Sequence, residues 1–167
     1  MGVGKTTIGH RLANSLNLKF RDLDDIIVNE QQMPISKIFD KKGELYFRKI
    51  ETQYLIREIE TQNPMVLSLG GGTPCYAHNM QFLQKQPHVV TIYLKAQITT
   101  LVERLFKQRQ IRPMIGHLNT EAELSEFIGK HLFERRPFYL KSQHTISVDD
   151  KSEEAVVRDI LNAIKVN

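Results

Sequence analysis

Cysteine, long apolar runs and blocks of like charge are scarce in this sequence of 167 residues. The single cysteine, Cys75, excludes an internal disulfide and any zinc site built from several cysteines, which favours a reducing compartment and so a cytoplasmic protein. No apolar run approaches the roughly 20 residues that a helix needs to cross a bilayer, so we expect no membrane partner. The histidines show no spacing typical of a metal site.

Charge is dispersed along the chain rather than gathered. The formal net charge of +4 is compatible with nucleic acid, and equally with a pocket for several anionic groups of a small molecule. Because no long block of like charges appears, the small-molecule interpretation is favoured and we expect no nucleic-acid partner. With 41% hydrophobic and 25% charged residues, the composition is that of a globular chain, and the length suits one domain covering residues 1–167.

Two apolar periods alternate along the chain. Short apolar runs predict strands at 19–23, 65–69, 88–94 and 144–148. Apolar residues at i, i+3, i+4 and i+7 predict helices over 5–16, over 43–61, from residue 98 and from residue 152. Strands of this kind between helices imply an α/β fold, a three-layer sandwich whose parallel sheet is covered on both faces. Ligands are then expected at the carboxyl ends of the strands.

The opening GVGKTT matches the end of a phosphate-binding P-loop. Gly4, Lys5 and Thr6 fill the last three places of G-x-x-x-x-G-K-[ST], whereas the first glycine of that pattern would precede Met1. Backbone amides from Gly2 to Thr6 could cradle phosphate oxygens, Lys5 could reach the β- and γ-phosphates, and Thr6 could ligate Mg²⁺. The alternative is a chance match ahead of an ordinary helix.

A P-loop normally follows a buried strand, and none can precede Met1. We therefore expect the natural protein to carry roughly ten more residues upstream, about the length of one strand and the start of the loop. Without that strand, we expect a poorly stable and weakly active chain.

Carboxylates and glycines stand where strands are predicted to end. Asp22 and Asp24 lie at i and i+2 and would project to the same side of a strand end. One could hold a metal through water while the other meets the hydroxyl that attacks ATP. The alternative is a pair of solvated loop acids. The run Gly70, Gly71 and Gly72 after MVLSL indicates that something must come very close to the backbone.

The segment 107–119 is polar, rich in turn residues and without periodicity. It is either a surface loop or a lid that carries Arg112. Directly after it, Thr120 and Glu123 form the pattern of a capping box, which predicts that a helix begins there.

In this order the motifs GVGKTT, DLD, GELYFRKIE, SLGGG, IRPMI and RRPFY resemble the shikimate kinase family, over essentially the whole chain. The resemblance implies a P-loop NTPase fold of the nucleoside-monophosphate-kinase type. In that fold the first strand, which is missing from this chain, is central in the parallel sheet, with MVLSL and HVVTIYL as its neighbours. The resemblance also implies a monomer that uses ATP and Mg²⁺ to phosphorylate the 3-hydroxyl of shikimate, a step of chorismate and aromatic amino-acid biosynthesis.

The resemblance also implies roles by position. Nucleotide contacts would come from Gly2, Val3, Gly4, Lys5, Thr6, Thr7, Arg112 and Lys151, with adenine also near Arg104 or Arg109. Shikimate would be bound by Asp24, Arg48, Gly70, Gly71, Gly72 and Arg135, with residues 24–60 as the main shikimate-binding region. Thr6 and Asp22 would hold Mg²⁺, and the catalytic residues would be Lys5, Asp24 and Arg112.

The chemistry of these residue types agrees with the assignment. The planar fork of arginine matches a carboxylate, so Arg48 and Arg135 could fix a small anion. Glu51 follows Arg48 by three residues and could orient its guanidinium, although such a pair is most often a surface ion pair.

Other functions remain open. A gluconate kinase would share the loop and an acidic substrate but should lack FRKIE together with SLGGG. A nucleotide-dependent binding module, or a chain impaired by its incomplete P-loop, would need no acceptor pocket, against which the arginines and Asp24 argue.

Overall fold

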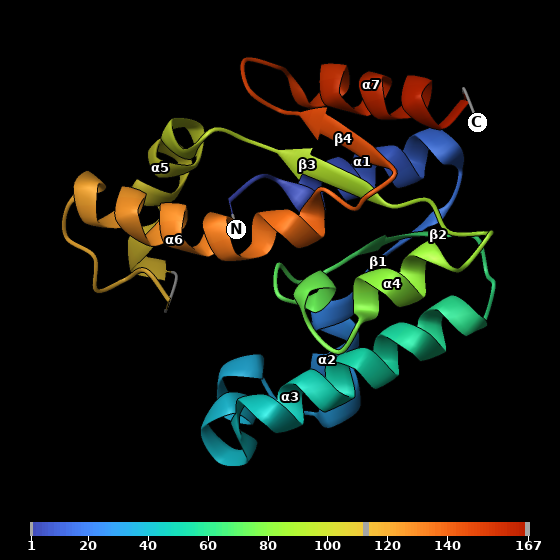
Figure 1. The fold of residues 1–167 in the computed structure, drawn as a ribbon, viewed down its shortest axis with the longest axis horizontal. Helices are drawn as coiled ribbons and strands as arrows, with labels where there is room; N and C mark the ends of the chain where they lie inside the picture. The colour runs from blue at the N-terminus through green and yellow to red at the C-terminus, as the bar shows by residue number, and fades with distance from the viewer. Residues whose placement is uncertain (1, 112–113, 166–167) are drawn as a thin grey trace. The chain divides into compact units, whose positions relative to one another are not determined.

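The computed structural model describes residues 2–111 and 114–165. Helices and strands alternate along the chain, as the apolar periods predict (Figure 1). In order they are α1 (Lys5–Leu16), β1 (Lys19–Asp22), α2 (Leu23–Gln31), α3 (Ile35–Glu60), β2 (Met65–Ser68), the short 3-10 helix η1 (Thr73–Cys75), α4 (Asn79–Gln84), β3 (Ile92–Lys95), α5 (Ile98–Phe106), the short 3-10 helix η2 (Arg109–Ile111), α6 (Glu121–Tyr139), β4 (His144–Ser147) and α7 (Glu153–Lys165).

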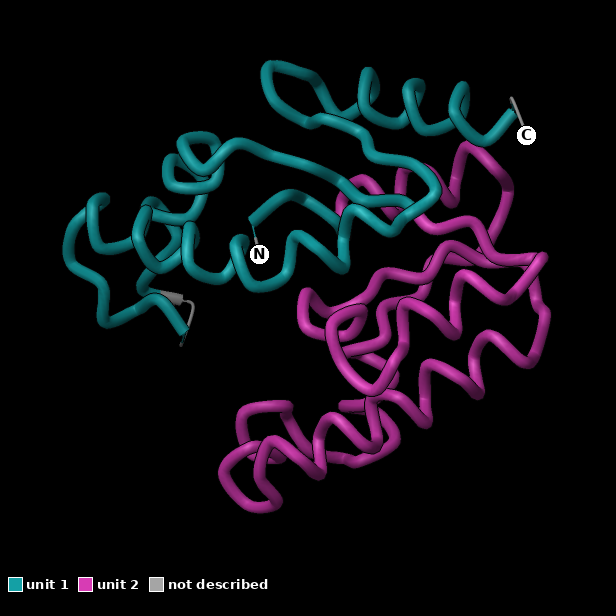
Figure 2. The backbone as a smooth tube through the Cα atoms, in the orientation of Figure 1, with its two compact units in different colours: residues 1–5, 92–167 teal, residues 6–91 magenta. Residues whose placement is uncertain are grey.

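The chain divides into two compact units, which Figure 2 draws in different colours. Unit 1 contains residues 1–5 and 92–167, and unit 2 contains residues 6–91. Each unit holds one pair of parallel strands. In unit 2, β1 pairs with β2, with Lys19 opposite Met65. In unit 1, β3 pairs with β4, with Ile92 opposite His144. The predicted α/β class with parallel strands is therefore confirmed, while the expectation of one domain stays a prediction.

The core of unit 2 is built mainly by α2 and α3. Leu23 and Ile27 on α2, and Ile38 and Leu55 on α3, have no exposed surface. Burying side chains of this size contributes about 1.5 to 3 kcal/mol each, so these contacts dominate the stability of the unit. The same packing fixes the position of the polar side chains on the other faces of α2 and α3.

In unit 1, α5 packs on α6. Leu105 of α5 and Leu124 of α6 are almost fully buried, together with Ile115 from the predicted lid segment. The capping box at the start of α6 is present, because the Thr120 hydroxyl accepts from the Glu123 amide while the Glu123 carboxylate accepts from Thr120 N–H. That sequence prediction is confirmed.

Several elements go beyond the sequence prediction. Helix α2, the short helices η1, η2 and α4, and the part of α3 before Gly43 were not expected. The part of α3 after Gly43 matches the helix predicted over 43–61. Gly43 interrupts α3 with φ of 80° and ψ of 168°, a conformation that is essentially limited to glycine. The strand predicted before the glycine loop concerns residues outside this chain and stays a prediction. Among the described residues, no helix is long and apolar enough to span a membrane.

Candidate active site

The opening glycines have a backbone conformation that few other residues adopt. Gly2 has φ of 72° and Gly4 has φ of 91°, both in the region that favours glycine. A Cβ at Gly2 would also lie 2.7 Å from Cγ of Leu105, so a side chain has no room there. Helix α1 begins directly afterwards, at Lys5. The free amides of its first turn are therefore available to an anion.

The side chains of this loop differ in burial: one packs against the core, and the others are exposed or half-buried. Val3 packs against the α5–α6 core of unit 1, which anchors the loop. Gly4, Thr6 and Thr7 are exposed, and Lys5 is half-buried. The loop can thus present its amides and the Thr6 hydroxyl to a ligand while Val3 holds it in place.

The two aspartates do not share one side of a strand, and this part of the sequence prediction is wrong. Strand β1 ends at Asp22, which caps α2: its Oδ1 accepts a hydrogen bond of 3.0 Å from Asp24 N–H. Asp24 lies inside the first turn of the helix. The reason is that an aspartate satisfies the free amides at a helix start, so the strand ends at Asp22, one residue before its predicted end at residue 23.

Arg48 of α3 lies against acidic partners on the same helix. Its Nη1 donates to Oε2 of Glu51 over 2.8 Å, and its Nε lies 3.4 Å from Oε1 of Glu44. The predicted contact between Arg48 and Glu51 is confirmed, and it is no surface pair, since only 14% of the Arg48 side chain and 1% of Glu51 are exposed. Burial by itself lowers the pKa of Arg48, but the hydrogen bond and charge of Glu51, helped by Glu44, leave that pKa above its ordinary value.

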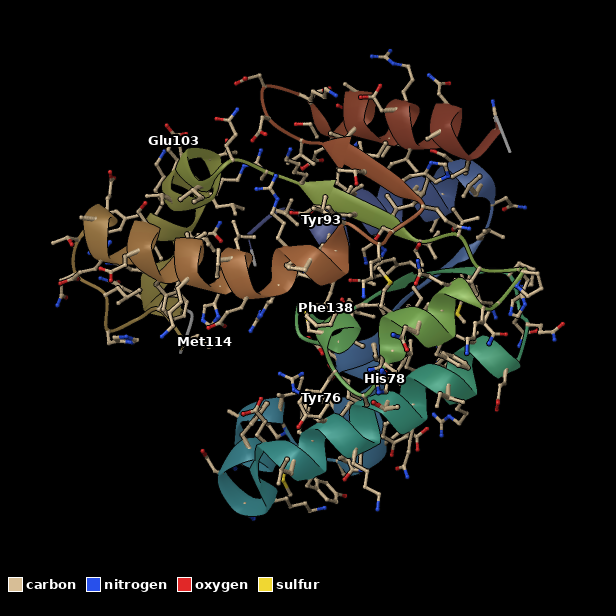
Figure 3. The ribbon with its side chains drawn as sticks, viewed as in Figure 1. Tyr76, His78, Tyr93, Glu103, Met114 and Phe138 are labelled. Atoms are coloured by element: carbon tan, nitrogen blue, oxygen red, sulfur yellow. The ribbon has the colours of Figure 1, made fainter. Side chains whose placement is uncertain are left out.

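Aromatic rings complete the surroundings of Arg48. Its guanidinium carbon lies 5.2 Å from the ring centre of Phe47 and 5.7 Å from that of Tyr76, which Figure 3 labels. Among the described residues, no hydrogen bond engages Nη2 of Arg48. This nitrogen keeps a donor for an anionic ligand.

The glycine run after β2 passes directly beside this guanidinium. A Cβ at Gly72 would lie 2.7 Å from both Nη1 and Nη2 of Arg48. The expectation that something approaches this backbone closely is therefore confirmed, at least for Arg48. A Cβ at Gly70, two residues earlier in the run, would meet three side-chain oxygens at 3.1, 3.2 and 3.3 Å, those of Thr73, Asp24 and Glu51.

Sequence reasoning missed two residues of this arrangement. Thr73 Oγ1 donates to Oε1 of Glu51 over 2.6 Å, and Asn79 Nδ2 donates to the Thr73 carbonyl over 2.9 Å. Thr73 has no exposed surface, and Asn79 has 1%. A threonine that follows three glycines and precedes a proline was the available signal, but it does not reveal a partner 22 residues away.

The other predicted site residues lie in unit 1 or outside the described residues. Arg135 is half-buried on α6. Lys151 donates to Asp159 over 2.8 Å, and Arg109 lies over the Phe106 ring, 4.1 Å from its centre. Arg104 is exposed on α5. Arg112 lies outside the described residues.

The loop before α7 is tied to the start of α5 by one carboxylate. Asp149 accepts from Gln97 N–H over 2.9 Å and from the Thr100 hydroxyl over 2.7 Å. Burial by itself raises the pKa of Asp149, but these hydrogen bonds and one from Ser147 outweigh it, so the pKa is below its ordinary value. The loop that holds Lys151 is therefore fixed in place at Asp149, two residues before Lys151.

Comparison with known proteins gives a consistent result. The family model described as "Shikimate kinase" matches residues 1–165. A shikimate kinase of Flavobacterium psychrophilum is 44% identical over 160 residues, which cover 96% of this chain and 92% of that protein. A shikimate kinase of Flavobacterium johnsoniae is 40% identical over 164 residues, which cover 98% of this chain and 94% of that protein.

Solved structures agree. The crystal structure of shikimate kinase from Bacteroides thetaiotaomicron matches with a TM-score of 0.86 at 31% identity, over 99% of this chain and 94% of that one. Shikimate kinase from Acinetobacter baumannii, solved in complex with shikimate, matches with a TM-score of 0.84 at 32% identity, over 100% of this chain and 89% of that one.

Proposed function

The chain belongs to the shikimate kinase family, and we propose that it transfers the γ-phosphoryl group of ATP to the 3-hydroxyl of shikimate, giving shikimate 3-phosphate and ADP. The observation that carries the proposal is the arrangement in unit 2, where Arg48 lies against Gly72 while Asp24 lies beside Gly70. A cation and a carboxylate thus lie beside the same short backbone segment, at glycines two residues apart. This suits a substrate that carries a carboxylate and hydroxyls on one small ring.

The acceptor is held by charge and by the open backbone. Arg48 binds the shikimate carboxylate through Nη2, since Glu51 already occupies Nη1. Arg135 is the second carboxylate ligand. Asp24 accepts from the 3-hydroxyl and orients it, and the backbone of Gly70, Gly71 and Gly72 lies along the ring.

The nucleotide is held by the opening loop. Amides of residues 2–7, namely Gly2, Val3, Gly4, Lys5, Thr6 and Thr7, cradle the phosphates of ATP, and the Lys5 ammonium neutralises the β- and γ-phosphates. Arg112 supplies further positive charge from the 107–119 lid. Lys151, on the loop anchored by Asp149, contacts the adenine side of the nucleotide.

Magnesium fits the donors that the chain offers. Among the described residues there is no group of three or more histidine, cysteine, aspartate or glutamate side chains that could form a protein cage for a metal. Mg²⁺ needs none, because it keeps several waters and binds nucleotide phosphates through one or two protein groups. The exposed Thr6 hydroxyl and, through water, Asp22 would hold it. Bound there, Mg²⁺ would neutralise the charge of the phosphates.

The residues act mainly by position and charge. Phosphoryl transfer passes through a loose transition state in which negative charge spreads over the moving group. Lys5 and Arg112 stabilise that charge, while Asp24 aims the attacking hydroxyl and accepts its proton late in the step. Exclusion of water by the lid keeps the phosphoryl group from hydrolysis.

The test is a coupled assay of ADP release, with shikimate, gluconate and nucleoside monophosphates offered as separate acceptors. We expect release that depends on shikimate alone. Arg48→Ala and Arg135→Ala should each weaken shikimate binding by about 2 to 4 kcal/mol and leave the KM for ATP within a few-fold. Release with gluconate instead would assign the chain another acceptor. Loss of ATP binding in both variants would move the acceptor site elsewhere.

We also propose a cytoplasmic monomer. The single cysteine supports a reducing compartment, and the monomer is the state that the family resemblance implies. Light scattering on the purified protein tests the oligomeric state.

A further inference from the structure

Glu51 lies at the centre of a buried polar chain that connects α3, η1 and α4. One carboxylate oxygen, Oε2, accepts from Arg48, and the other, Oε1, accepts from the Thr73 hydroxyl over 2.6 Å. The chain continues to Asn79, which donates to the Thr73 carbonyl. Every member except Arg48 is almost fully buried.

We propose that Thr73 and Asn79 are positioning residues for the acceptor substrate, and that they act through Glu51 on the guanidinium of Arg48. The inference rests on the proposed function, since it assumes that Arg48 binds the shikimate carboxylate. Neither residue needs to touch the substrate.

The geometry of Glu51 decides which nitrogens of Arg48 stay available. A buried carboxylate can take both Nη groups of an arginine in a bidentate pair, which is the strongest arrangement open to it. Here the Thr73 hydroxyl occupies Oε1, so Glu51 binds Arg48 through Oε2 and Nη1. Thr73 thereby keeps Nη2 available for a substrate.

Thr73 also helps to hold the backbone of the glycine run. It follows the glycine run directly, and its amide donates to the Gly70 carbonyl over 3.1 Å while the Cys75 amide donates to the Gly72 carbonyl over 2.9 Å. Asn79 secures this turn from α4, through Thr73 and through its own amide, which donates to the Tyr76 carbonyl over 2.8 Å. The hydrogen bonds of Thr73 and Asn79 therefore hold the backbone of the glycine run and, through Glu51, the guanidinium of Arg48.

Loss of the Thr73 hydroxyl would affect Glu51 directly. Without Thr73 Oγ1, Glu51 Oε1 is a buried charged oxygen lacking its donor, and the penalty for leaving such a group unpaired is large. Rotation of the carboxylate onto both nitrogens of Arg48 would relieve it. In this rotated position Glu51 would occupy Nη2, which would then no longer bind the substrate. Removal of the Thr73 hydroxyl should therefore weaken shikimate binding more than it lowers the stability of the fold.

The test compares Thr73→Val, which keeps the shape and removes the hydroxyl, with Thr73→Ser, which keeps the hydroxyl. We expect Thr73→Val to raise the KM for shikimate about tenfold, within the range for a lost hydrogen bond to a charged group. The KM for ATP should stay within twofold of the wild type, and Thr73→Ser should restore shikimate binding. Titration calorimetry with shikimate alone measures the same loss without turnover.

Thr52→Val is the matched control. Thr52 neighbours Glu51 on α3, and its buried hydroxyl has no hydrogen-bond partner among the described residues. Its removal should leave both KM values unchanged. If Thr73→Val does not fold, Thr73→Ala replaces it, because a smaller side chain cannot clash. In a Glu51→Gln background, Thr73→Val should have much less effect, since coupled residues are not additive.

The outcomes separate the two proposals. A wild-type protein that releases no ADP with shikimate overturns the proposed function and the inference with it. An active wild type with an unchanged shikimate KM in Thr73→Val overturns the inference alone. The inference is also overturned if Thr73→Val and Thr73→Ser weaken shikimate binding equally, or if the KM values for shikimate and ATP rise in parallel. Either result would show that Thr73 has a general structural role. Asn79→Ala should raise the shikimate KM in the same selective way.

Discussion

Gly72 is a glycine because of space rather than backbone angle. Its φ of −83° is open to any residue, yet a Cβ there would lie 2.9 Å from Cζ of Arg48 and closer still to both Nη atoms. The far end of an arginine side chain can move, so the clash displaces Arg48 before it disrupts the fold. Ligand binding should therefore respond more strongly than stability.

Gly72→Ala should raise the KM for shikimate by about tenfold or more, a change of at least about 1.4 kcal/mol in binding. In the proposed function, the added methyl group pushes the guanidinium away from the place where it meets the shikimate carboxylate. The KM for ATP should not change. Steady-state kinetics in Gly72→Ala, Arg48→Ala and the double variant measure this. If the two effects simply add, the methyl group does not act through Arg48.

Asp24→Asn should lower kcat by about 10² to 10⁴ fold with folding intact. The amide cannot accept the proton of the hydroxyl, but it has nearly the same shape. The cap of α2 should survive, because it uses the backbone amide of Asp24 and the carboxylate of Asp22. Asp25→Asn, one residue later and exposed, is the control and should be nearly silent. Normal turnover in Asp24→Asn would assign the proton to another group or to water.

Contacts between single residues differ in how far the sequence reveals them. Glu51 follows Arg48 by three residues on a helix, so helical geometry alone predicts that they meet. Thr73 meets Glu51 only after α3 and the β2–η1 connection have packed together. No local period encodes that contact. Polar side chains whose partners lie far along the chain are therefore the ones that sequence reasoning misses.

At the scale of elements, patterns with one strong period were predicted well. Helix α5 was found from its apolar spacing and α6 from its capping box, and both are present. The junction of β1 and α2 was not predicted, because an aspartate in D-L-D is equally compatible with the end of a strand and with the N-cap of a helix. The cap prevails since α2 can bury Leu23, Ile26 and Ile27 against the core of unit 2.

The capping box of α6 should make a measurable contribution to stability. Thr120→Ala should lower the free energy of unfolding by about 1 kcal/mol, as is typical of a lost N-cap. Hydrogen bonds from the backbone amides of Asn119 and then Thr120 lower the pKa of the Glu123 carboxyl below its ordinary value of 4.5. The ionised carboxylate therefore stabilises the fold above about pH 4.5, and this contribution is lost as the pH falls through the lowered pKa.

Urea unfolding at several pH values checks this expectation. The difference in stability between wild type and Glu123→Gln should be present at pH 7 and shrink in acid, since glutamine carries no charge at either pH. Glu121→Gln, in the same helical turn and exposed, serves as the control. A difference that is independent of pH would mean that the charge of Glu123 has no part in the cap.

At the scale of the whole molecule, the alternation of strands and helices was enough to predict the α/β class. This alternation did not predict the division into two compact units. The spacing of apolar residues identifies each helix or strand, but it does not say which of them pack together. The described acceptor-site contacts of Arg48, Asp24 and the glycine run all lie in unit 2. Whether the units unfold together is then a test of the single-domain prediction.

Shikimate should raise the thermal stability of the protein as one cooperative transition. A ligand at 100 times its Kd adds about 2.7 kcal/mol to the folded state. For a chain of this size each kcal/mol shifts Tm by about 2 to 4 °C, so we expect a rise of roughly 5 to 10 °C. If residues 1–167 form one domain, calorimetry shows a single peak that moves as a whole, although the described contacts belong to unit 2. Arg48→Ala should abolish the shift at the same shikimate concentration, while Thr52→Val should retain it. Two peaks, of which only one moves with shikimate, would instead show that the two units unfold independently.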